Sequence, residues 1–132
     1  MYEKLKKLSE NKAKHFHENV DPSGWYKWSA KYFEELPQEI AEALNESRDD
    51  NTVYLEDELG DVFWDYLMLL NTLKLEWKIT SVDMVLERAY NKFSERVGKD
   101  WNKVLLDQSE WKEIKNNQKV KRKQEHEEKY GK

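Results

Sequence analysis

The chain has 132 residues, of which 38% are apolar and another 38% charged, with a formal net charge of -4 and no cysteine. This composition excludes a disulfide framework, a zinc–thiolate site and a thiol nucleophile, and it gives no support to a general nucleic-acid binder. Glycine and proline are scarce, so we expect an all-α protein. The N-terminus lacks the apolar core of a signal peptide, and the longest apolar run is too short for a bilayer. We therefore expect a soluble, cytoplasmic protein.

The N-terminal third of the chain predicts two helices separated by a turn. Residues 2–19 form a weakly amphipathic helix, and the sequence Asp-Pro-Ser-Gly at 21–24 is typical of a turn. Apolar residues then recur at a helical period from Trp25 to Glu46. Pro37 lies inside this stretch, and we expect it either to kink the helix or to begin a new one.

The strongest structural signal is a helix over about residues 53–77, which follows a polar loop and a cap at Asn51 or Thr52. Its middle is apolar on nearly every side, which indicates burial on nearly every side. The apolar stripe recurs at spacings of three and four, at Leu55, Leu59, Val62, Tyr66, Leu69 and Leu73. A small bundle cannot cover such a helix alone, so we expect an antiparallel helical bundle that forms a homodimer or homotetramer.

The remaining sequence predicts a third main helix, capped at Thr80 or Ser81 and stopped at Gly98. A short segment at 101–106 follows, and a last helix opens near residue 107 or 110. From residue 116 onward the chain is almost wholly polar and is either a solvated helix or a frayed tail. We expect one domain over residues 1–106 and a charged helix or tail over 107–132.

Two pairs of acidic residues have the spacing that places both members on one side of a helix. They are Glu39 with Glu42, and Glu58 with Asp61, each set in an apolar run. Spacing alone favours ordinary solvated faces, because acidic residues are frequent in this chain. Both pairs nevertheless lie beside an apolar stripe, where a carboxylate carries a desolvation cost.

A divalent cation held between the two helices would offset that cost. A short loop makes consecutive helices antiparallel neighbours, so Glu39, Glu42, Glu58 and Asp61 could face one another. Carboxylate oxygens are ligands that Mg²⁺ prefers, and Mn²⁺ is an alternative. Gly60 lies between the last two acids, where close helix approach or room for a substrate would explain it.

These motifs resemble those of the MazG-like, all-α nucleoside triphosphate pyrophosphohydrolases, whose signature is Glu-x-x-Glu, a gap and then Glu-x-x-Asp. The stretch Asp57–Phe63, Asp-Glu-Leu-Gly-Asp-Val-Phe, is similar to the second half, and Val85–Arg96 to the family's following basic helix. The resemblance covers about residues 25–100. It implies Mg²⁺-dependent hydrolysis of ribo- or deoxyribonucleoside triphosphates to monophosphate and pyrophosphate, in the manner of nucleotide-pool sanitation.

The first half of the signature leaves its register open. The family usually starts it with two adjacent glutamates, and Gln38 stands where the first is expected if Glu39 and Glu42 are the metal pair. The rival register uses Glu35 and Glu39. We prefer Glu39 and Glu42 because they complete a set of four carboxylates; Glu35, Glu46 and Asp65 share the same faces and stay as alternatives.

A triphosphate also needs positive groups, since carboxylates and phosphates repel one another. Lys92 and Arg96 are spaced to address phosphate oxygens, a role that the resemblance also implies, whereas a surface ion pair is the alternative. Asn91 and Trp28 are further substrate-binding candidates, and Glu39 is our candidate for the base that takes a proton from water. A different class of function stays open: a catalytically inactive oligomerisation or regulatory module of the same fold, which Gln38 favours.

Overall fold

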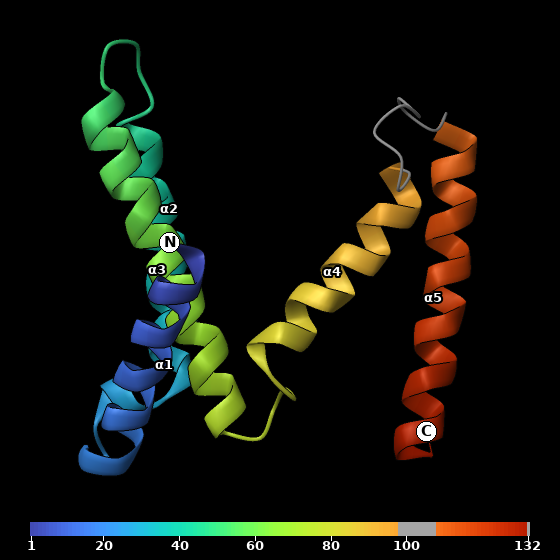
Figure 1. Ribbon diagram of the computed structural model, residues 1–132, viewed down its shortest axis with the longest axis horizontal. Coiled ribbons are helices and arrows are strands. Elements are labelled where there is room, and N and C mark those ends of the chain that lie inside the picture. The colour runs from blue at the N-terminus through green and yellow to red at the C-terminus, as the bar shows by residue number, and fades with distance from the viewer. Residues whose placement is uncertain (98–107, 132) are drawn as a thin grey trace. The chain divides into compact units, whose positions relative to one another are not determined.

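The computed structural model describes residues 1–97 and 108–131, and every regular element in this part of the chain is helical (Figure 1). The prediction of an all-α fold is thus confirmed. In chain order the elements are α1 (Tyr2–Asn19), the 3₁₀ turn η1 (Trp25–Lys27), α2 (Ser29–Asn45), α3 (Thr52–Leu75), α4 (Val82–Val97) and α5 (Gln108–Tyr130). The expected stop at Gly98 and segment at 101–106 lie outside the described residues. No helix in the described ranges is long and apolar enough to cross a bilayer.

The chain divides into two compact units, Met1–Val82 and Asp83–Lys132. In the first unit α1 and α2 both pack on α3. Their shared core consists of Ala13, Tyr32, Met68 and Leu69. A buried hydrogen bond of 2.9 Å from Asn71 Nδ2 to Ser9 Oγ also ties α1 to α3. The second unit contains α4 and α5, and α5 includes the polar stretch that begins at residue 116.

The start of α2 differs from its prediction. The helical conformation is interrupted at Trp28, an extended residue between η1 and α2. The expected turn before η1 is present: the Ser23 N–H donates to Asp21 Oδ1 over 2.8 Å, and the Gly24 N–H donates to the Asp21 carbonyl over 2.6 Å. A Cβ at Gly24 would overlap the side chain of Val20, so this position requires glycine.

Pro37 does not begin a new helix, since α2 runs through it without interruption. Proline cannot donate to the carbonyl of the residue four positions earlier, Phe33. Both residues are exposed, so water can reach the unpaired carbonyl. The alternative that Pro37 begins a new helix was therefore wrong, and the alternative of a kink stays a prediction.

The long helix α3 is buried in its C-terminal half only. Leu67, Met68, Leu69 and Leu70 are all at most 5% exposed. Towards its N-terminus, in contrast, Leu59 is 50% and Phe63 43% exposed. A single chain therefore leaves apolar residues of the first half of the helix exposed, and their burial by a second subunit stays a prediction.

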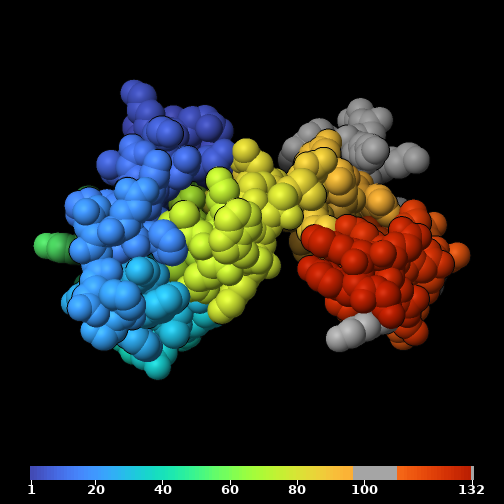
Figure 2. Space-filling model, turned by 90° about the horizontal axis from the view of Figure 1, so that it is seen from below, coloured from blue at the N-terminus to red at the C-terminus, as the bar shows by residue number. Residues whose placement is uncertain are grey.

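A carboxylate at the end of α3 caps the start of α2. Glu76 accepts hydrogen bonds of 2.7 Å from both the N–H and the hydroxyl of Ser29. These groups lie where a helix leaves its first N–H donors unpaired and favours negative charge. Figure 2 shows the light-blue residues around η1 beside the yellow-green end of α3. Burial raises the pKa of Glu76, but the bonds from Ser29 and the ion pair with Lys78 outweigh it and hold the pKa below its usual value.

Substitution Glu76→Gln should destabilise the protein by about 1–2 kcal/mol at pH 7, because it weakens the cap. A lowered pKa contributes stability that is present above the ordinary glutamate value of 4.5 and is lost as the pH falls through the folded value. The difference from wild type should therefore shrink below about pH 4. Urea unfolding at several pH values measures it. Glu56→Gln, at an exposed position of α3, is the control, and an equal effect there would contradict the capping role.

Candidate metal centre

The connection between α2 and α3 holds the two helices side by side (Figure 1). Asn51, which precedes α3, does not cap it through its side chain. Its Nδ2 instead donates to the carbonyl of Glu46 over 2.8 Å and to Glu46 Oε2 over 2.6 Å. Arg48 also forms an ion pair with Glu46, at 3.2 Å. Glu46, one of the alternative metal ligands, is thus already engaged in closing the loop.

Packing of α2 on α3 brings Glu39, from the first acidic pair, close to both members of the second pair, Glu58 and Asp61. Oxygens of Glu39, Glu58 and Asp61 all lie within 4.8 Å of one another. The structure thereby brings together three of the four carboxylates that the sequence analysis selected. The fourth, Glu42, is exposed and outside this set, but its charge raises the pKa of both Glu39 and Glu58.

Glu39 also belongs to a second set of three carboxylates, one turn along both helices. Oxygens of Glu35, Glu39 and Asp65 lie within 4.8 Å of one another, and Asp65 is only 7% exposed. Both alternatives of the register around Gln38 thus converge on Glu39. Gln38 itself is exposed.

Glu39 carries the largest electrostatic cost in the cluster. Burial, followed by the charges of Glu42, Asp65 and Asp61 and a hydrogen bond with Glu42, raises the pKa of Glu39 to about 7. Two carboxylates can share a hydrogen bond only when one of them is protonated. In the absence of a cation, the cluster therefore favours the protonated form of Glu39.

Several carboxylate oxygens in the cluster are buried without any hydrogen-bond donor in the part of the chain that the structure describes. They are Oε2 of Glu39, Oε2 of Glu58 and Oδ2 of Asp65. Burial is the first cause of the raised pKa values of Glu58 and Asp65, and neighbouring carboxylates add to it. Buried polar atoms normally have partners. Unsatisfied hard oxygen atoms that converge from two helices match the ligands that Mg²⁺ or Mn²⁺ takes.

One cation beside the cluster is already paired. The ammonium group of Lys31 lies 2.8 Å from Glu35 Oε2 and sits over the rings of Tyr26 and Tyr32. It lowers the pKa of Asp65, but burial and the charges of Glu35 and Asp61 outweigh it. Lys31 therefore balances the edge of the cluster at Glu35 and leaves the repulsion around Glu39 in place.

Residues 29–100 match the model of the MazG nucleotide pyrophosphohydrolase domain. The match covers more than half of the chain, and it includes both acidic pairs and α4. The chain belongs to this family. No curated protein and no solved structure matched the chain. The resemblance seen in the sequence is thus confirmed at the level of the family.

The MazG match ends at residue 100, so α5 lies beyond it. Asn91, Lys92 and Arg96 lie on α4, in the second compact unit, whereas the acidic cluster lies in the first. Arg96 is only 6% exposed, and its Nε donates to Gln118 Oε1 over 2.9 Å. Its guanidinium group also lies over the rings of Phe93 and Trp111, so Arg96 holds α4 and α5 together.

Trp28 lies at the opposite end of α2 from the loop that closes the cluster. Eleven residues separate it from Glu39, which corresponds to roughly 16 Å along a helix. Its indole N–H donates to the carbonyl of Pro22 over 2.8 Å, and the side chain is 39% exposed. The structure thus gives Trp28 a role in the turn before α2.

Gly60 has an open environment. A Cβ added there would meet nothing within 4 Å, so close approach of another helix does not explain this glycine in the single chain. Room for a ligand beside Glu58 and Asp61 stays as its explanation.

Substitution Glu39→Gln should make the metal-free protein less sensitive to pH. A carboxyl group whose folded pKa of about 7 exceeds the unfolded 4.5 contributes stability that is complete below 4.5 and is lost as the pH rises through 7. In EDTA the wild type should lose stability between about pH 5 and 8, and the variant should lose on the order of 1 kcal/mol less, since water screens part of the repulsion. Thermal unfolding across this range measures the difference. A variant that matches the wild type at every pH would contradict the crowding at Glu39.

Proposed function

We propose that the protein hydrolyses nucleoside triphosphates to nucleoside monophosphate and pyrophosphate with the help of Mg²⁺. The observation that carries the proposal is the convergence of Glu39, Glu58 and Asp61 within the region that matches the MazG family, where Glu39 and Glu58 each have a buried oxygen without a donor in the described part of the chain. Family membership supports a nucleotide pyrophosphohydrolase, and the acidic cluster supports dependence on a divalent metal.

Glu39, Glu42, Glu58 and Asp61 would hold the metal, and Mn²⁺ fits the same oxygen ligands. The second set, Glu35 with Asp65, offers a further position around the shared Glu39. When bound, Mg²⁺ supplies positive charge that offsets the phosphates and favours attack by water. This arrangement also satisfies the oxygens that the helices otherwise leave without donors.

The carboxylate of Glu39 would accept the proton of the attacking water as the α–β phosphoanhydride bond breaks. Lys92, Asn91 and Arg96 would bind the phosphate chain, with Lys92 the freer of the two cations because Arg96 is bound to Gln118. Trp28 stays a candidate for contact with the base.

A catalytically inactive module of the same fold is the second candidate, and Gln38 in place of an acid is the observation that favours it. The two functions differ in their response to metal. A working site should bind Mg²⁺ saturably and be stabilised by it in the presence of nucleotide. A bare interaction module should show neither response.

We also propose that the protein is a homodimer or homotetramer, because apolar side chains remain exposed on the helices that form the cluster. Leu44 is 72%, Ile40 53% and Leu59 50% exposed. Contiguous exposed apolar surface is typical of protein interfaces. A cytoplasmic location stays a prediction.

The experiment that tests the function is a panel of ribo- and deoxyribonucleoside triphosphates with Mg²⁺, scored separately for pyrophosphate and orthophosphate. We expect pyrophosphate and nucleoside monophosphate in equal amounts. Variants Glu58→Gln and Asp61→Asn should lose at least about a hundredfold in rate while keeping wild-type circular dichroism. Glu56→Gln, exposed on the same helix, should keep wild-type activity. Orthophosphate as the sole product would reject the proposed bond, and full activity of Glu58→Gln would reject the site.

Sedimentation should show a species of two or four chains, and the double variant Leu44→Ser with Leu59→Ser should shift it towards the monomer. The loss of two exposed leucines removes apolar contact area from an interface. Lys7→Ser with Lys14→Ser, on exposed positions of α1, is the control. A wild-type monomer at micromolar concentration would contradict the assembly.

A further inference from the structure

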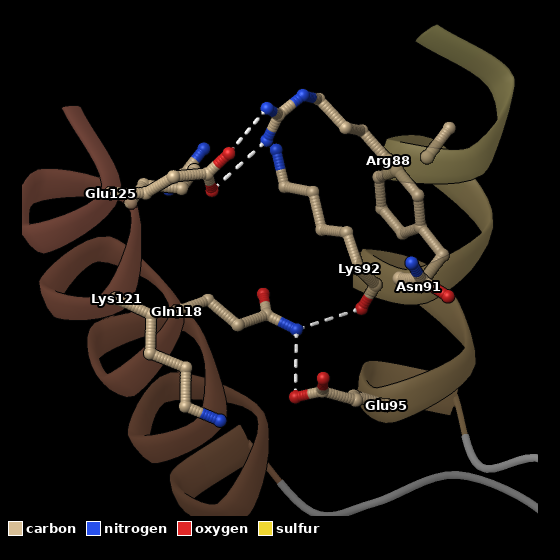
Figure 3. Close-up of a pocket in the computed structure, with 10 residues that line it drawn as sticks. Arg88, Asn91, Lys92, Glu95, Gln118, Lys121 and Glu125 are labelled. Atoms are coloured by element: carbon tan, nitrogen blue, oxygen red, sulfur yellow. Dashed lines mark hydrogen bonds and ion pairs between the residues drawn. The ribbon is translucent and has the colours of Figure 1, made fainter. Parts of the chain in front are cut away.

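The second unit contains a groove between α4 and α5 with a volume of about 470 Å³ (Figure 3). Such a volume lies within the range of small-molecule sites. Its charged lining comprises four cations and two carboxylates: Arg88, Lys92, Lys121, Arg122, Glu95 and Glu125. The groove therefore has an excess of two positive charges, in a protein whose net charge is negative.

Both carboxylates of the groove are already occupied by the bonds that join the helices. Glu125 accepts hydrogen bonds from two guanidinium nitrogens of Arg88, from Nη2 over 2.6 Å and from Nη1 over 3.3 Å. Gln118 Nε2 donates to Glu95 over 3.2 Å and to the carbonyl of Lys92 over 2.9 Å. Figure 3 shows these bonds bridging the two helices. They hold the groove in shape, and the only cation they neutralise is Arg88.

The other cations of the groove have no anionic partner within ion-pair distance in the described part of the chain. Lys92, Lys121 and Arg122 all belong to this group. Burial, and then the charges of Arg122, Arg96 and Lys115, lower the pKa of Lys92. Like charges gathered from two helices repel one another, so a ligand with several negative charges would relieve the repulsion.

We propose that the α4–α5 groove binds an oligophosphate anion, with Lys92 from α4 and Lys121 and Arg122 from α5 as its ligands. A pyrophosphate group carries several negative charges on a short chain, which matches several cations along one groove. The family model ends before α5, so two of these three cations lie outside the matched region. Only the source of the anion rests on the proposed function: it is either the phosphate chain of the substrate or the released pyrophosphate.

The test measures binding of inorganic pyrophosphate by isothermal titration calorimetry in EDTA, where the acidic cluster cannot contribute through a metal. The double variant Lys121→Gln with Arg122→Gln should bind at least about tenfold more weakly, because charge-assisted hydrogen bonds are lost. Lys119→Gln with Lys123→Gln is the matched control. It removes the same charge from exposed positions on the same helix that do not line the groove, and it should change affinity less than about threefold.

Parallel titrations with a non-hydrolysable α,β-methylene triphosphate distinguish the sources. Binding of the analogue that is weakened in the groove variant assigns the groove to substrate, and binding of pyrophosphate alone assigns it to product. The absence of saturable binding of both ligands to the wild type would overturn the proposal, as would equal weakening by the groove and control pairs. Because no metal is present, failure of the groove is distinguishable from failure of the hydrolytic site.

Discussion

Core packing between α2 and α3 is the constraint on which the rest of the first unit depends, because it brings together carboxylates that repel one another. Core packing of Tyr32 against Met68 and Leu69 fixes these helices side by side, and that placement forces Glu39 towards Glu58, Asp61 and Asp65. The nearby lysine, Lys31, balances Glu35 alone. A fold selected only for stability would not keep buried oxygens without donors at this interface. Their presence is understandable if a cation completes the structure in the working protein.

The second unit also contains charges without a compensating partner, but these charges are positive. The two carboxylates of the α4–α5 groove, Glu95 and Glu125, accept hydrogen bonds that join the helices, whereas Lys92 and Arg122 lie near other cations. Arg96, which the family resemblance assigns to phosphate, serves here as a buried link to Gln118. The chain thus keeps uncompensated negative charge on one set of helices and uncompensated positive charge on another.

The sequence was sufficient for the all-α fold and for the second acidic pair, because helical periodicity and the Glu-Leu-Gly-Asp motif are local features. It could not choose the register at Gln38. In the structure Glu39 belongs to both alternatives, and only the packing of α2 on α3 shows that Glu35 and Asp65 form a second set. The sequence also could not predict the interruption of the helix before α2, because the hydrogen bond from the Ser29 N–H to Glu76 joins residues 47 positions apart. The sequence predicted a charged helix or tail at the C-terminal end but not the α4–α5 groove, because the lining of the groove depends on which lysines face α4.

We propose above all that the acidic cluster of α2 and α3 is a divalent metal site. The most direct measurement is a crystal structure grown with Mn²⁺ and a non-hydrolysable nucleotide, with anomalous diffraction recorded at the manganese edge. We expect an anomalous peak within coordination distance of Glu39, Glu58 and Asp61, at about 2.2 Å from their oxygens. Bound nucleotide with no manganese among these carboxylates would contradict it.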